Sequence, residues 1–81
     1  MVSIFIPDIP EFMPLINGAR AFECTIQEPR KGYWRIDSEN EICFTRKGLG
    51  LGPALWNSAL TGGFRGKIVE YSRDVMRIVG E

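Results

Sequence analysis

Histidine is absent from this 81-residue sequence, and cysteine occurs only twice. The lack of histidine removes the commonest general base and the commonest protein ligand of metal ions. Cys24 and Cys43 lie far apart and lack the paired spacing of a structural zinc site. We therefore expect no metal or cofactor, assign no catalytic residue, and favour a protein without enzymatic activity. Three acidic residues lack the spacing of a calcium-binding loop and are expected to solvate a turn: Asp37, Glu39 and Glu41.

Net charge is also missing, because ten basic residues balance ten acidic ones. A neutral chain has no general attraction to nucleic acid or to anionic lipid, so we do not expect a nucleic-acid partner. No apolar run approaches the length of a membrane span. The N-terminus lacks the basic lead and the long apolar core of a signal peptide. These absences predict a cytoplasmic protein that does not enter a membrane.

The length and composition are typical of one small globular domain, which we place over residues 1–81. Hydrophobic residues make up 44% of the chain and charged residues 25%, an ordinary mix for a folded domain. A chain of this size buries only about 60–65% of its unfolded surface, so its core is thin. Small domains with thin cores often gain stability by association.

Residues 19–46 show the alternation of apolar and polar side chains that is typical of strands with one buried face. Turn signals interrupt this pattern twice, and together they predict a three-stranded antiparallel meander. Val2 to Ile6 predicts a further short strand. Cys24 falls on the expected inner face and Cys43 on the outer face, so we predict that they do not form a disulfide bond.

Two helices are expected after the meander. Residues 53–60 begin with a proline suited to the first helical turn and place apolar side chains on one side. Residues 67–79 gather their charged side chains on one face of a helical wheel, whereas neither face of a strand would be uniform. These side chains are Glu70, Arg73, Asp74 and Arg77. We predict a C-terminal helix, with a hairpin turning at residues 72–74 as the alternative. The predicted fold class is α+β, an antiparallel sheet of three to four strands with both helices covering one face.

Two glycine-rich loops stand beside basic residues and precede the expected helices. Neither matches a phosphate-binding motif, because the first ends in proline and the second lacks the Ser or Thr that would bind magnesium. A weaker indication remains, since free N–H groups at the start of a helix favour an anion. The candidate anion- or ligand-binding residues are Arg46, Lys47, Gly50, Gly52, Arg65 and Lys67. The alternative is that both loops are flexible connections with solvated charges.

An apolar segment interrupted by prolines follows the first expected strand. Pro7, Pro10 and Pro14 keep this arm from forming a long helix or a central strand. Exposed apolar patches usually mark an interface, so we predict that the arm contacts a partner. The predicted interface residues are Phe5, Ile9, Phe12, Met13 and Ile16. The alternative is that the arm covers the open face of its own sheet.

Two functions stay open. The one we favour is a non-catalytic binding or interaction module that forms a homodimer or binds another protein through the arm and the basic loops. The other is a small-molecule-binding protein or minimal enzyme with an aromatic-lined pocket between the sheet and the helices. The residues predicted to line that pocket are Trp34, Trp56 and Tyr71. The molar mass in solution and a search for a deep cavity distinguish the two.

Overall fold

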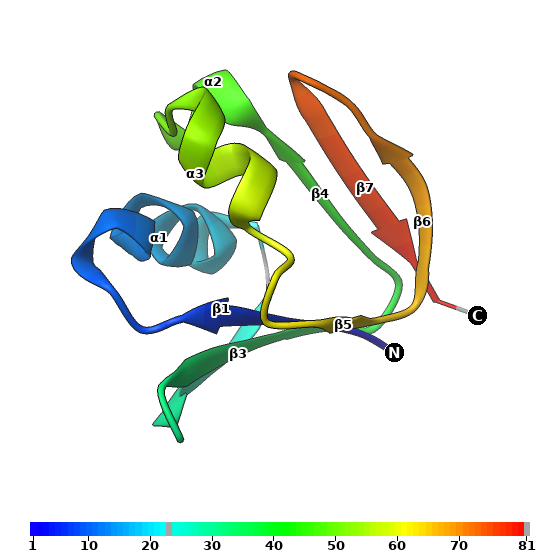
Figure 1. Cartoon of the computed structure of the whole chain (residues 1–81). Coiled ribbons are helices and arrows are strands. Elements are labelled where there is room, and N and C mark those ends of the chain that lie inside the picture. The colour runs from blue at the N-terminus through cyan, green and yellow to red at the C-terminus, as the bar shows by residue number, and fades with distance from the viewer. Residues whose placement is uncertain (23, 81) are drawn as a thin grey trace.

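The computed structural model describes residues 1–22 and 24–80, and Glu23 and Glu81 lie outside the described residues. Short strands alternate with short helices along the described chain (Figure 1). In chain order the elements are β1 (Val2–Pro7), the 3₁₀ helix η1 (Pro10–Phe12), α1 (Met13–Ala21), β2 (Thr25–Arg30), β3 (Tyr33–Ser38), β4 (Glu41–Thr45), α2 (Arg46–Leu49), α3 (Pro53–Ser58), β5 (Phe64–Arg65), β6 (Lys67–Tyr71) and β7 (Val75–Val79).

The strands form two antiparallel sheets, one of order β2-β3-β1-β5 and one of order β4-β7-β6. Both β1 and β2 pair antiparallel with β3. They therefore run parallel to each other, with α1 between them in the chain, as in a split β-α-β unit. The chain passes directly from the four-stranded to the three-stranded sheet at two corners, between β3 and β4 and at Gly66 between β5 and β6. The α+β class with antiparallel pairing is confirmed.

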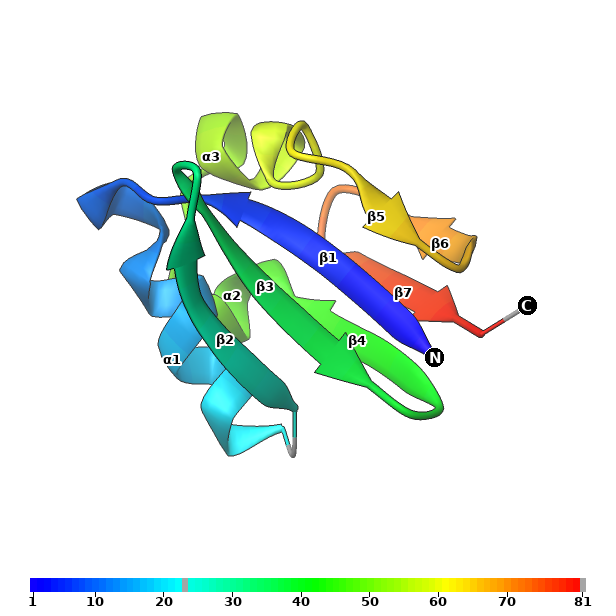
Figure 2. The same cartoon turned by 90° about the horizontal axis from the view of Figure 1, so that it is seen from below.

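The core lies between the inner faces of the two sheets and the helices (Figure 1). Side chains alternate along the strands, so every second residue of the central strands points into this space. Twelve apolar side chains are 0% exposed: Val2, Ile4, Ile6, Leu15, Ile16, Ala19, Ile36, Ile42, Trp56, Ala59, Met76 and Ile78. Figure 2 shows the opposite, outer face of the four-stranded sheet without any described helix over it.

The predicted C-terminal helix is wrong, because residues 67–79 form a hairpin of β6 and β7. The alternative reading placed the turn correctly: the Ser72 N–H donates to the Val75 carbonyl over 2.8 Å and closes it. The pairing shifts between Ile68 and Glu70, which is the mark of a β-bulge. A bulge changes which side chains share a face, and this is why neither face of a regular strand was uniform.

The predicted single meander is also wrong in two respects. Residues 19–21 belong to α1, so the first strand of the region begins at Thr25. Strands β2 and β3 pair as predicted, but β4 pairs with β7 and joins the other sheet. The connection from β3 to β4 lacks the glycine that a tight two-residue hairpin prefers. The chain therefore turns a corner there and does not fold back.

The second half of the predicted apolar arm packs on its own chain, whereas Ile9 stays 37% exposed. Pro10 and Pro14 stand in the first turns of η1 and α1, where a missing N–H costs no helical hydrogen bond. Phe12 is only 3% exposed and Ile16 is 0% exposed, so the alternative, in which the arm covers its own sheet, describes them correctly. Their assignment to an intermolecular interface is corrected accordingly, because a side chain in the chain's own core offers no surface to a partner.

The first strand, the helix after the glycine-rich loop and the state of the two cysteines agree with the sequence predictions. The strand predicted from Val2 is present as β1, and the helix predicted over residues 53–60 is present as α3. Its proline, Pro53, occupies the first turn, as the sequence indicates. Cys24 and Cys43 are both free thiols.

Candidate functional site

Arg46, the first predicted anion ligand, is used to hold the fold together. Its guanidinium donates to the Arg73 carbonyl over 3.2 Å, to the Leu51 carbonyl over 3.3 Å, and to the Asp74 carboxylate over 3.3 Å. The bonds to Arg73 and Asp74 tie the helical segment after β4 to the turn of the β6–β7 hairpin. A guanidinium with three such partners has little capacity left for an external anion.

The other residues of the predicted anion site do not converge on Arg46. Thr45, next to Arg46, pairs with Val75 at one end of β7, whereas Lys67 pairs with Val79 at the other end. Five residues of strand separate these ends by roughly 14 Å. Gly50 adopts a left-handed conformation that caps α2, and Gly52 precedes α3. The two basic loops therefore remain separate, and their glycines serve local backbone geometry.

The predicted aromatic pocket assembles in part. A depression of about 370 Å³ lies between α3 and the turn of the β6–β7 hairpin, and Trp56 and Tyr71 line it. Their rings meet edge to face with centroids 6.0 Å apart. The Trp56 indole donates to the Ser72 carbonyl over 2.8 Å, and the Tyr71 hydroxyl donates to the Trp56 carbonyl. Burial raises the pKa of Tyr71.

Trp34 does not belong to this pocket. Its indole N–H donates to the Asp8 carboxylate over 3.1 Å, near the start of the arm, and it packs against the core from β3. The remaining pocket residues are Pro53, Asn57, Ser72 and Arg73. The pocket is therefore a shallow site with a few polar groups, and only two of its three predicted residues meet.

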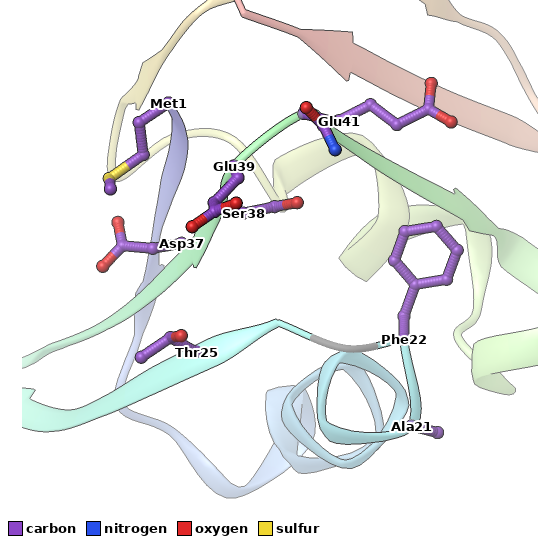
Figure 3. Close-up of a pocket in the computed structure, with 9 residues that line it drawn as sticks. Met1, Ala21, Phe22, Thr25, Asp37, Ser38, Glu39 and Glu41 are labelled. Atoms are coloured by element: carbon purple, nitrogen blue, oxygen red, sulfur yellow. The ribbon is translucent and has the colours of Figure 1, made fainter.

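A larger depression of about 650 Å³ lies at the corner between β3 and β4, and the three acidic residues of the predicted turn line it (Figure 3). Figure 3 shows the Asp37 and Glu41 carboxylates pointing to opposite sides. Glu41 accepts a hydrogen bond of 2.7 Å from Arg77, and Asp37 is bonded within its own sheet. Across the described residues, no group of three or more such side chains is arranged to hold a metal ion.

Asp37 is the centre of a buried polar network on the outer side of the four-stranded sheet. Its carboxylate accepts hydrogen bonds from the Ser3 hydroxyl, from Arg35 over 2.9 Å and from Gln27 over 3.1 Å. Burial alone would raise the pKa of Asp37, but these hydrogen bonds and the charge of Arg35 outweigh it and hold the pKa below its usual value. Ser3 is 1% and Asp37 8% exposed. The Asp37 carboxylate thus accepts three hydrogen bonds from within the chain, so the network stabilises the sheet.

Exposed apolar side chains gather along residues 64–71, which we call the edge segment. Of the eight large apolar side chains exposed in the described chain, four lie here: Phe64 at 38%, Ile68 at 36%, Val69 at 48% and Tyr71 at 37%. The segment comprises β5, Gly66 and β6, which end the order of the four-stranded and three-stranded sheets respectively. Every residue of β6 is exposed, and Figure 1 shows β6 at the periphery of the molecule.

Sequence reasoning missed this edge because it assigned residues 67–79 to a helix. The sequence does contain a sign of this edge, because Gly66 stands alone within residues 64–71, among apolar and charged side chains. Gly66 has a φ of +127°, which only glycine adopts readily. A side chain there would also collide with the Val79 carbonyl. The glycine therefore marks the corner at which the edge passes from one sheet to the other.

Comparison with known proteins adds no assignment. No protein-family model matches the chain, and no curated protein matches it. Within the described residues, no helix is long and apolar enough to span a membrane.

Proposed function

We propose that this protein is a small, non-catalytic interaction module that binds a polypeptide partner along the edge segment. The observation that carries the proposal concerns residues 1–22 and 24–80: a strand edge without a neighbour among them coincides with half of their exposed large apolar side chains. Soluble proteins usually cover or charge such an edge, because its free N–H and C=O groups accept another strand. Strand addition of this kind uses the backbone for affinity and neighbouring side chains for specificity.

The edge also carries features that limit indiscriminate pairing. β6 is only five residues long, contains a bulge, and bears one basic and one acidic side chain, Lys67 and Glu70. Bulges and charges are common protections of edge strands. An edge that combines apolar side chains with one charge of each sign favours a particular partner in a particular register over general aggregation.

A photo-crosslinking experiment in the native cells tests this proposal. A photoreactive phenylalanine analogue replaces Ile68, which is 36% exposed, or Ile9, which is 37% exposed and lies outside the edge segment, between β1 and η1. We expect a polypeptide adduct from position 68 that is absent from position 9 and is lost when Val69→Lys is added. Equal adducts from both positions, or none from position 68, would contradict the proposal.

A second candidate function is small-molecule binding in the pocket beside α3. It is favoured by the meeting of Trp56 and Tyr71 with Asn57 and Arg73 around a volume of about 370 Å³, since ligand sites combine aromatic walls with a few polar groups. Native mass spectrometry of the freshly purified protein tests it. A bound small molecule that is lost in Arg73→Ala and Asn57→Ala supports the pocket, and a bare chain in every sample counts against it.

A further inference from the structure

We infer that the partner of the edge segment is a second copy of this chain, with β6 pairing antiparallel to β6 about a two-fold axis. This inference rests on the proposed function and names its partner. A two-fold axis is the commonest symmetry of soluble oligomers, and it requires each contact to occur twice. The edge must then be complementary to itself when its direction is reversed.

The bulge decides which side chains of β6 share a face. Ile68 pairs with Ile78, and Tyr71 pairs with Met76, and both partners point into the core. Ile68 and Tyr71 therefore lie on the inner face, three positions apart. Lys67 and Glu70 pair with residues of the outer face, Val79 and Arg77. The edge thus presents an apolar pair on one face and an opposite-charge pair on the other, at the same spacing.

One antiparallel register satisfies both pairs at once. When Ile68 of one copy stands opposite Tyr71 of the other, symmetry repeats the contact on the other side of the axis. In that register Lys67 of each copy is a diagonal neighbour of Glu70 of the other, within reach of long side chains. The axis then passes between Val69 and Glu70, so the two bulges face each other and their irregular geometry is matched.

The backbone at the end of β6 is compatible with this register. The Ser72 N–H already donates to the Val75 carbonyl inside the hairpin. Hydrogen-bonded and non-hydrogen-bonded pairs alternate in an antiparallel ladder, so the N–H and C=O of Tyr71 point away from β7, towards the open edge. Pairing would join the two three-stranded sheets into one continuous sheet. The contact is small beside the roughly 800 Å² per partner of standard interfaces, so we expect a micromolar dimer.

Charge reversal tests the pairing directly. In K67E the substituted side chain meets Glu70 of the second copy, and in E70K two lysines meet. We expect each single variant to raise the dimer dissociation constant by about tenfold or more, since like charges in cross-strand positions repel. The double variant K67E/E70K restores opposite charges and should return the constant to within about threefold of the starting protein. An equimolar mixture of the two single variants should form a heterodimer.

The readout is sedimentation velocity from about 1 to 500 μM, a range centred on the expected affinity. The matched controls are K47E and E28K, which change net charge by the same amounts at exposed positions on α2 and β2. Their dissociation constants should stay at the starting value, and mixing them should add nothing. Circular dichroism reports folding, and formation of the heterodimer itself shows that both single variants are folded.

The experiments distinguish a wrong partner from a wrong function. A protein that stays near 9.2 kDa at all concentrations, while position 68 still crosslinks to a different polypeptide, overturns the second copy and leaves the interaction function standing. Dimerisation that ignores charge reversal, or that the double variant does not restore, overturns the register. The absence of any adduct at position 68 overturns the proposed function and this inference together.

Discussion

Replacing Asp37 by asparagine should destabilise the fold by about 1–2 kcal/mol, a value set by the loss of charge-assisted hydrogen bonds. The substitution keeps Oδ1, which accepts from both Ser3 and Arg35, but removes the negative charge that strengthens those bonds. Oδ2 becomes an amide group, and Gln27 must rotate its own amide to accept from it. Asp37→Ala should cost more, about 2–4 kcal/mol, because the buried Ser3 hydroxyl then loses its acceptor.

The pH dependence of this effect follows from the lowered pKa of Asp37. A carboxyl whose pKa is lower in the folded than in the unfolded state stabilises the fold at every pH above its unfolded value. That stabilisation is lost as the pH falls through the lowered pKa of the folded Asp37 carboxyl. The difference in stability between the wild type and Asp37→Asn should therefore be constant near pH 7 and should narrow towards pH 3.

Urea denaturation followed by tryptophan fluorescence measures this difference at pH 7, 5 and 3. Glu39→Gln is the control, because Glu39 is an exposed acid two residues away on the same corner. We expect its effect to stay within about 0.5 kcal/mol. An Asp37→Asn protein as stable as the wild type at pH 7, or a difference that does not change down to pH 3, would refute the role given to the network.

The packing leads to three other predictions, two on substitutions and one on the reactivity of a cysteine. Gly62→Ala should lower the free energy of unfolding, measured by urea denaturation, by about 2–3 kcal/mol, because the added Cβ would collide with the Phe5 carbonyl. Gly52→Ala is the control: the space around Gly52 is open, so the change should be less than about 0.5 kcal/mol. Trp56→Phe should cost about 2 kcal/mol, since a fully buried ring shrinks and its indole hydrogen bond is lost; a neutral effect would contradict its place in the core. Alkylation of Cys24 at pH 8 should be slower than that of free cysteine, because burial and the nearby Asp37 carboxylate raise the pKa of its thiol. Mass spectrometry of timed samples measures both rates, and equal rates would contradict this prediction.

Local patterns in the sequence predicted the elements whose partners are near in the chain. The alternation around Ile26 and Ile36 gave the correct pairing of β2 with β3. Pro53 gave the correct start of α3, because its fixed φ suits a first helical turn. Neither prediction required knowledge of distant residues.

The same patterns could not decide which sheet β4 enters. Ile42 and Phe44 alternate inward in either arrangement, so the side chains of β4 are equally consistent with pairing to β3 or to β7. The choice depends on pairing with residues 75–79, thirty or more positions later in the chain. The role of Arg46 was hidden from the sequence for a related reason, because its partners Arg73 and Asp74 come from the distant hairpin turn.

The bulge in β6 links the failed prediction to the proposed interaction. A regular strand repeats its faces every two residues, but the extra residue places Lys67 and Glu70 together on the outer face and Ile68 and Tyr71 together on the inner face. A spacing of three is close to the helical period, so the segment resembled an amphipathic helix in the sequence. In the folded hairpin the same spacing supplies two matched pairs that a reversed copy of the strand can satisfy. Deletion of Val69 leaves Ile68 opposite Ile78 and Glu70 opposite Arg77, so the variant should fold with the same faces. In the Ile68–Tyr71 register, however, Glu70 of each copy then stands directly opposite Glu70 of the other, so sedimentation velocity should show a weaker dimer than that of the starting protein.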